Sequence, residues 1–138
     1  MYYSKSAKYA IQAMIYLAES NQEDLIMVSE IAEAYKIPKS FLSKITRTLG
    51  KHNLLKTTRG RNGGIQLSKS ADDIKLIHIV EAIDGPEAGC ERCGFGFDAC
   101  SDDEPCPFHH KWGHIIKDAH SFIKTESLAE LLAESLQE

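Results

Sequence analysis

The stretch IAEAYKIPKSFLSKITRTLGKHNLLKTTRGRNGGIQL, residues 31–67, decides the fold of this chain of 138 residues. Its first half holds two short segments with apolar residues at helical spacing, separated by Ile37 and Pro38. A residue before proline disfavours the helical region, so one helix should end here and the next begin at Pro38 or Ser40. Two short runs rich in β formers follow, joined by a glycine-rich turn that suits a β-hairpin. Two helices and a β-ribbon in this order predict a winged helix-turn-helix.

The second helix of this pair carries hydroxyl and cationic side chains on one face. The opposite face holds Leu42, Ile45 and Leu49. Phe41 is expected both to pack on the core side and to be a candidate DNA contact. The DNA major groove is about 12 Å wide and admits an α-helix, so the polar face is a candidate reader of phosphates and base edges. Thr46 is a further hydroxyl candidate. The predicted DNA contacts are Lys39, Ser40, Phe41, Ser43, Lys44 and Arg47 on the helix, with Arg59 and Arg61 at the hairpin tip.

The charge of the chain is unevenly distributed. Residues 1–70 hold 11 Lys and Arg against 5 Asp and Glu, net +6, whereas residues 71–138 hold 5 against 15, net −10. Nine basic residues and no acidic one lie between positions 36 and 69. A stretch of this kind favours a polyanionic partner over a merely solvated face. We therefore expect double-stranded DNA as a partner.

Helical spacing extends to both sides of this region. Residues 4–20 and 71–84 each carry an apolar stripe, and Ser29 is placed to cap a short helix over residues 30–36. Ser127 and Glu130 are spaced as a capping box for a last helix over residues 128–136.

A long helix should begin at Pro107. Its apolar residues repeat at spacings of 4, 3 and 4, and a seam of this kind is buried best against a copy of itself. This predicts a homodimer. The predicted interface residues are Trp112, Ile116, Ala119 and Ile123.

All four cysteines lie within one short window, at positions 90, 93, 100 and 106, and His109 follows. Residues 85–105 are rich in glycine and acidic side chains and are expected to form a loop. Clustered thiols in a chain without an apolar leader indicate metal or redox chemistry rather than disulfides spread over the fold. The predicted metal or cofactor ligands are Cys90, Cys93, Cys100, Cys106 and His109.

Three motifs together resemble one known family. They are SKSAKYA at residues 4–10, the segment from Ile31 to Leu42, and RGRNGGIQL at residues 59–67. This combination resembles the IscR/NsrR family of bacterial winged-helix transcription regulators, several of which sense redox state, nitric oxide or iron through an iron–sulfur cluster. The resemblance covers about residues 3–132. It implies a homodimer paired through the final helix, with two recognition helices on a palindromic operator.

The resemblance also implies a ligand set. Family members with a cluster typically have three cysteines, the last two separated by five residues, and some add a histidine shortly afterwards. Cys100, Cys106 and His109 match that spacing, and either Cys90 or Cys93 can stand for the first cysteine. The cluster implied by the resemblance is 2Fe–2S or 4Fe–4S, held by four thiolates or by three thiolates and an imidazole.

Other chemistries are open to the same thiols. Four cysteines, or three and a histidine, also suit a structural zinc ion, which would make the chain a DNA-binding or interaction module. Metal-free thiols could instead act as a disulfide switch. A thiol–disulfide enzyme would need a strand before the C-x2-C pair and a helix after it, and the flanking glycines provide neither. We therefore expect no enzyme.

The predicted organisation has three parts. A winged helix-turn-helix domain spans residues 1–84, a cysteine-rich cluster-binding loop residues 85–106, and a dimerisation helix with a C-terminal helix residues 107–138. The fold class is mainly α with a small β-hairpin. No apolar run approaches the roughly 20 residues of a membrane span, and no secretory h-region is present, so we expect a cytoplasmic protein without a membrane partner.

Overall fold

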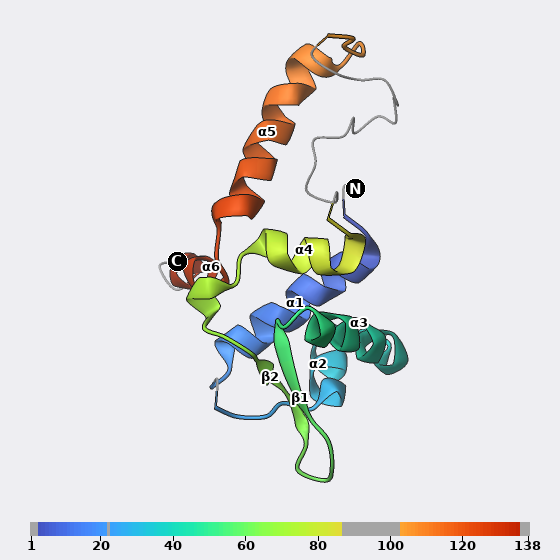
Figure 1. Ribbon diagram of the computed structural model, residues 1–138, viewed down its shortest axis with the longest axis vertical. Coiled ribbons are helices and arrows are strands. Elements are labelled where there is room, and N and C mark those ends of the chain that lie inside the picture. The colour runs from blue at the N-terminus through green and yellow to red at the C-terminus, as the bar shows by residue number, and fades with distance from the viewer. Residues whose placement is uncertain (1–2, 22, 87–102, 136–138) are drawn as a thin grey trace.

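The structure, a computed structural model, describes residues 3–21, 23–86 and 103–135. Within them lie six α-helices, one 3-10 helix and one two-stranded hairpin, which confirms the predicted fold class. In chain order (Figure 1) the elements are α1 (Lys5–Glu19), α2 (Val28–Tyr35), α3 (Lys39–Lys51), β1 (Leu55–Thr58), β2 (Gly64–Leu67), η1 (Ala71–Asp73), α4 (Leu76–Asp84), α5 (His109–Thr125) and α6 (Leu128–Ser135).

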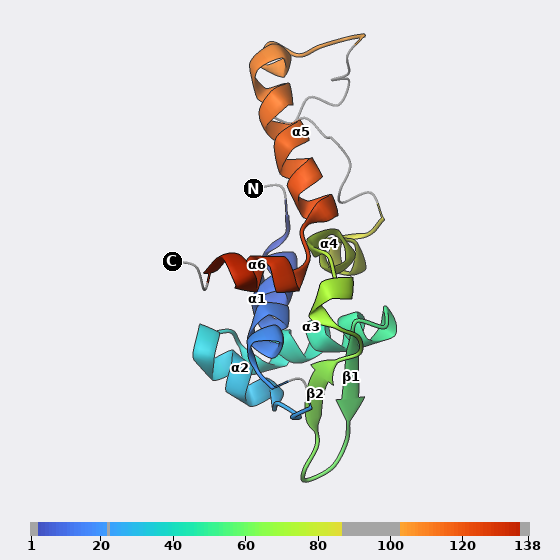
Figure 2. The same ribbon diagram turned by 90° about the vertical axis from the view of Figure 1, so that its left-hand side faces the viewer.

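Helix α1 is the central element of the body. It packs against α2 and α3 on one side and against α4 and α6 on the other (Figures 1 and 2). Ala7, Ala10 and Ala13 on α1 are fully buried, and their small side chains allow the neighbouring helices to approach closely. Helix α1 therefore contacts both the predicted DNA-binding helices and the C-terminal half of the chain.

The helix pair α2 and α3 forms as predicted, with a shifted first boundary. Helix α2 begins at Val28, and its N-cap is Met27, so the expected cap at Ser29 is wrong. Lys36 then takes a left-handed conformation with φ of 56°, which turns the chain into Pro38 and α3. The hydroxyl of Tyr16 donates to Glu30 at 2.5 Å and ties α2 to α1.

The hairpin is antiparallel and continues into a third extended segment. Leu55 pairs with Leu67 at its base, and Thr58 pairs with Gly64 next to the turn. Ile26 forms an isolated bridge with Ile65 on the other edge of β2. The hairpin is therefore anchored to the segment that leads into α2.

Residues 71–84, expected as one helix, are two. Ser70 caps the short η1, an extended segment follows, and α4 starts only at Leu76. The break arises because Leu76 donates its backbone N–H to Glu126, and Leu128 donates to Ile74, so this segment pairs with the distant start of α6. Ser127 caps α6 through a bond from the Glu130 N–H at 3.1 Å, which is one of the two bonds of the expected box.

Helix α5 projects away from the body (Figures 1 and 2). It begins at His109 rather than at Pro107, because Phe108 is the N-cap and its carbonyl accepts the N–H of Trp112 at 2.8 Å. Its last turn is anchored where Ile123 packs against Leu76 and Ile77 of α4. Among the described helices none combines the length and apolar character that crossing a membrane requires.

Candidate DNA interface and cysteine site

Helix α3 separates its buried and exposed faces as an amphipathic helix should. Leu42, Ile45 and Leu49 are buried in the core. The predicted contacts Lys39, Ser40, Phe41, Lys44 and Arg47 are exposed, and Ser43 is half-buried. A cationic surface one helix wide is thus presented to solvent, in the form that a major groove accepts.

Thr46 does not belong to this surface. It is only 4% exposed, and its hydroxyl donates to the carbonyl of Ser43 at 3.0 Å. The expectation that Thr46 reaches DNA is therefore wrong. Helical spacing alone places it at the edge of the polar face, and only the packing of α3 on its neighbours shows it to be covered.

Phe41 lies at the rim between the two faces, 37% exposed. Its ring packs edge-to-face on Tyr9 of α1, with centroids 5.6 Å apart. The ammonium of Lys5 lies 5.7 Å from the centre of the same tyrosine ring. The first turn of α3 is therefore positioned by the first two turns of α1.

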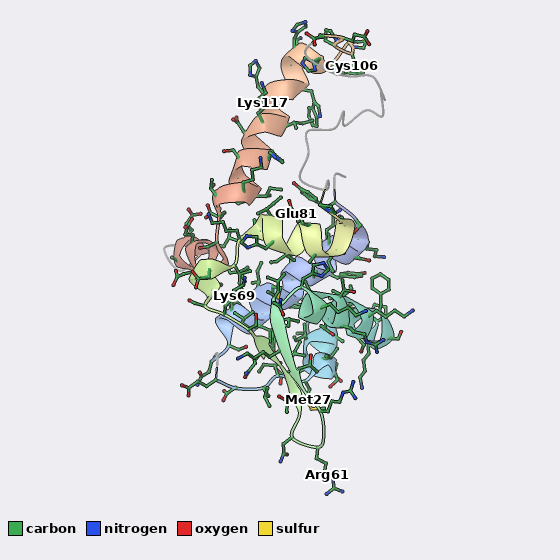
Figure 3. The ribbon with its side chains drawn as sticks, viewed as in Figure 1. Met27, Arg61, Lys69, Glu81, Cys106 and Lys117 are labelled. Carbon is green, nitrogen blue, oxygen red and sulfur yellow. The ribbon has the colours of Figure 1, made fainter. Side chains whose placement is uncertain are left out.

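The hairpin carries the second part of the surface. Arg59 and Arg61 are exposed, and Arg61 extends from the hairpin tip at one end of the molecule (Figure 3). Lys56 on β1 is exposed as well and was missed by sequence reasoning. The alternation of buried Leu55 with the polar residue after it could have identified Lys56 as an outward cation.

Only part of the cysteine site is described. Cys106 is half-buried at the start of the α5 region, and the N–H of His109 donates to its carbonyl at 3.0 Å. One turn of chain thus holds a thiol and an imidazole. Cys90, Cys93 and Cys100 lie outside the described residues, and within residues 3–21, 23–86 and 103–135 no three His, Cys, Asp or Glu side chains gather as a metal site.

Cys106 and the tip of the hairpin are far apart. Cys106 lies at the free end of α5, whereas Arg61 lies at the opposite end of the long axis (Figure 3). An effect of Cys106 on the hairpin therefore has to act over the length of the molecule.

The exposed apolar stripe of α5 differs from the predicted seam. Ile123, which the prediction places in the seam, is only 6% exposed and packs within its own chain. Three large apolar side chains are instead exposed along this region: Phe108 at 45%, Ile115 at 55% and Phe122 at 46%. Trp112 is half-buried and Ala119 exposed, and both lie between these three in sequence.

Comparison with known proteins identifies the family of this chain. The Rrf2 model, described as an iron-dependent transcriptional regulator, matches residues 3–134. The chain belongs to the Rrf2 family of transcriptional regulators. This confirms the resemblance to the IscR and NsrR regulators, which rests on the helix pair, the glycine-rich hairpin and the first-helix motif.

Several relatives share most of the length of this Rrf2 protein. A candidate HTH-type transcriptional regulator of Aquifex aeolicus is 34% identical over 134 residues, covering 96% of this chain and 92% of the relative. NsrR of Oceanobacillus iheyensis is 31% identical, covering 93% of this chain and 87% of the relative. IscR of Serratia proteamaculans is 29% identical, covering 94% and 77%.

Solved structures show the same fold. CymR, described as the global cysteine regulator of B. subtilis, superposes with a TM-score of 0.76 at 23% identity, covering 95% of each chain. T. potens IscR gives a TM-score of 0.70 at 23% identity, covering 96% of this chain and 86% of the neighbour.

Proposed function

We propose that this Rrf2 regulator binds a palindromic duplex as a homodimer and senses redox state, nitric oxide or iron through an iron–sulfur cluster held by residues 90–106. The observation that carries the DNA part is the exposed cationic face of α3 beside a hairpin tipped with Arg61. The cluster part is supported by the thiol spacing and by the NsrR and IscR relatives.

The DNA contacts divide by chemistry. The cations Lys39, Lys44 and Arg47 neutralise phosphates, while Ser40 and Ser43 donate to phosphates or base edges. Phe41, at the exposed rim of α3, is suited to apolar contact with a thymine methyl group. Arg59 and Arg61 enter an A·T-rich minor groove, whose narrow width attracts guanidinium groups. Lys56 joins the phosphate contacts.

The dimer forms through the outer part of α5. Phe108, Trp112, Ile115, Ala119 and Phe122 follow one another at spacings of 4, 3, 4 and 3, the repeat of two helices packed along a seam. Trp112 and Ala119 are shared with the predicted seam. Ile115 and Phe122 take the places of Ile116 and Ile123, because each is the more exposed of the adjacent pair.

The donors fit an iron–sulfur cluster. Thiolates are the ligands that such clusters prefer, imidazole is a known substitute, and Cys106 and His109 already share one turn. When bound, the cluster supplies a redox-active iron centre. Zinc held by the same donors, or a thiol switch without metal, remains the alternative chemistry of this loop.

The chain itself provides the link to DNA. Cys106 precedes α5 by only three residues, so holding its thiol restrains the first turn of the proposed dimer helix. Release of Cys106 then alters the geometry of the paired helices and with it the separation of the two α3 helices. Two half-sites at a fixed spacing would be bound less well.

One preparation distinguishes these chemistries. Protein purified without oxygen from iron-replete cells is examined by absorption spectroscopy and analysed for iron, acid-labile sulfide and zinc. The proposal expects a brown protein that contains iron and sulfide. A colourless protein with stoichiometric zinc would contradict it, and a metal-free protein that forms disulfides would favour the thiol switch.

A further inference from the structure

A contact between distant parts of the chain joins the start of α1 to the end of α4 (Figure 1). The backbone N–H of Ser4 donates to Asp84 at 3.0 Å, and the Ser4 hydroxyl donates to the other oxygen of the same carboxylate. The Ser4 hydroxyl oxygen also accepts the N–H of Ala7 at 3.0 Å and so caps α1. Asp84 is the last residue of α4.

Both ends of this contact favour a fixed geometry. A carboxylate that accepts two hydrogen bonds from one residue restricts the orientation of both partners more than a single bond does. The negative charge also lies at the N-terminus of α1, where the helix dipole stabilises it. Asp84 thus holds the first turn of α1 in both position and direction.

The held turn leads directly to the DNA-binding surface. Tyr9 lies five residues beyond Ser4 on the same helix, and its ring packs against Phe41 in the first turn of α3. Lys5, next to Ser4, has its ammonium near the Tyr9 ring. A displacement of the α1 start is therefore passed to α3 through two aromatic rings in contact.

We infer that Asp84 and Ser4 are positioning residues for DNA binding: their clamp sets the first turn of α3 through Tyr9 and Phe41. The inference rests on the proposed function for its effect on DNA. Its structural part, the control of α3 by Asp84, stands independently. Neither residue needs to touch DNA.

Three variants test the clamp. Asp84→Ala removes it but leaves the Ser4 cap on α1, Tyr9→Ala removes the ring that transmits it, and the double variant reports their coupling. Ser127→Ala is the control, because it removes a helix cap on α6 without touching the clamp. Thermal unfolding of each variant shows how far stability alone is affected.

Two readouts are needed. Hydrogen exchange of peptides covering 39–45 should become faster in Asp84→Ala and in Tyr9→Ala, but not in Ser127→Ala. Affinity for a selected duplex should fall roughly five- to tenfold in both clamp variants, with little further loss in the double variant.

The outcomes separate the two proposals. Unchanged exchange in 39–45, or duplex affinities that fall no further than in Ser127→Ala, would overturn the clamp. Additive losses in the double variant would overturn the route through Tyr9. If the unmodified protein binds no duplex, the proposed function fails, and the exchange data still decide whether Asp84 controls α3.

Discussion

Ile26 and Ile65 exchange two backbone hydrogen bonds, at 2.9 and 2.8 Å, and thereby fasten the hairpin to the segment before α2. Strand β2 is therefore the middle of three paired segments, with β1 on one edge and the segment at Ile26 on the other. This bridge explains how Arg59 and Arg61 can hold a fixed position relative to α3.

The bridge requires glycine at position 64. A Cβ there would lie 2.7 Å from the Ile26 carbonyl oxygen, a backbone atom that cannot move aside. We expect Gly64→Ala to lower the free energy of unfolding by about 1–3 kcal/mol, measured by denaturant titration. Gly113→Ala is the control: it meets open space within a helix and should stabilise by about 0.5–1 kcal/mol. Equal stability of Gly64→Ala and the unmodified protein would contradict the close approach.

The cations of α3 should act on all duplexes alike. Lys44→Ala and Arg47→Ala are each expected to weaken binding irrespective of sequence. Each should also reduce the slope of log affinity against log salt by about 1, because binding then releases one counterion fewer. Ser40→Ala and Ser43→Ala should change sequence preference if those hydroxyls touch bases. Lys117→Ala, on α5 and far from the hairpin (Figure 3), should leave affinity and slope unchanged. Fluorescence anisotropy at several salt concentrations measures both quantities.

The ligand assignment predicts unequal cysteines. Cys100→Ala and Cys106→Ala should each abolish the cluster absorption, whereas one of Cys90→Ala and Cys93→Ala should retain it, since four thiols exceed the family pattern by one. The visible spectrum and iron content of the anaerobic variants measure this. Full cluster content in both Cys100→Ala and Cys106→Ala would show that the assignment is wrong.

The seam on α5 can be tested against its alternative register. Ile115→Glu should give a monomer that keeps its helix-turn-helix fold but loses specific operator binding, because a carboxylate then lies in the middle of the dimer seam. Ile116→Glu, one position along, should leave the dimer largely intact. Sedimentation at micromolar concentration distinguishes the two. A dimeric Ile115→Glu together with a monomeric Ile116→Glu would show that the seam runs through Ile116. A monomeric unmodified protein would contradict the dimer altogether.

His78 should make stability depend on pH. Its Nδ1 accepts the N–H of Lys75 at 3.1 Å at the start of α4, and burial, followed by the charge of Lys69, lowers the pKa of His78 from its ordinary 6.5. The unfolded chain therefore binds the proton more readily than the folded one, and stability is lost as pH falls below 6.5. His78→Gln keeps an acceptor at this position and should lose less stability on acidification. If the unfolding free energies of the unmodified protein and of His78→Gln depend on pH in the same way, His78 does not cause the pH dependence.

Local sequence patterns were sufficient for much of the fold. Apolar spacing and the break at Pro38 located the helix pair, and the glycine-rich turn located the hairpin. The division of residues 71–84 could not be found in this way, because it is caused by backbone pairing of Ile74 with Leu128, which lies far along the chain. The bridge from Ile26 to Ile65 was missed for the same reason.

The site was predictable to the extent that exposure follows helical spacing. The cations of α3 are exposed as helical spacing indicates, and the arginines of the hairpin are exposed as their place at the turn indicates. Thr46 and Ile123 are buried, contrary to the exposure that spacing indicates, because each lies at the edge of a face where packing on another element decides burial. The register of the α5 seam could not be read from spacing, because adjacent residues give two nearly equivalent stripes.

Cluster-dependent DNA binding is the central claim, and one comparison tests it directly. A duplex is selected from a randomised pool by the anaerobic protein, and its affinity is measured before and after chemical removal of iron from the same sample. The account predicts a palindromic duplex whose affinity falls at least about fivefold when iron is removed. Equal affinities in the two states, or no duplex bound by either at low salt, would contradict it.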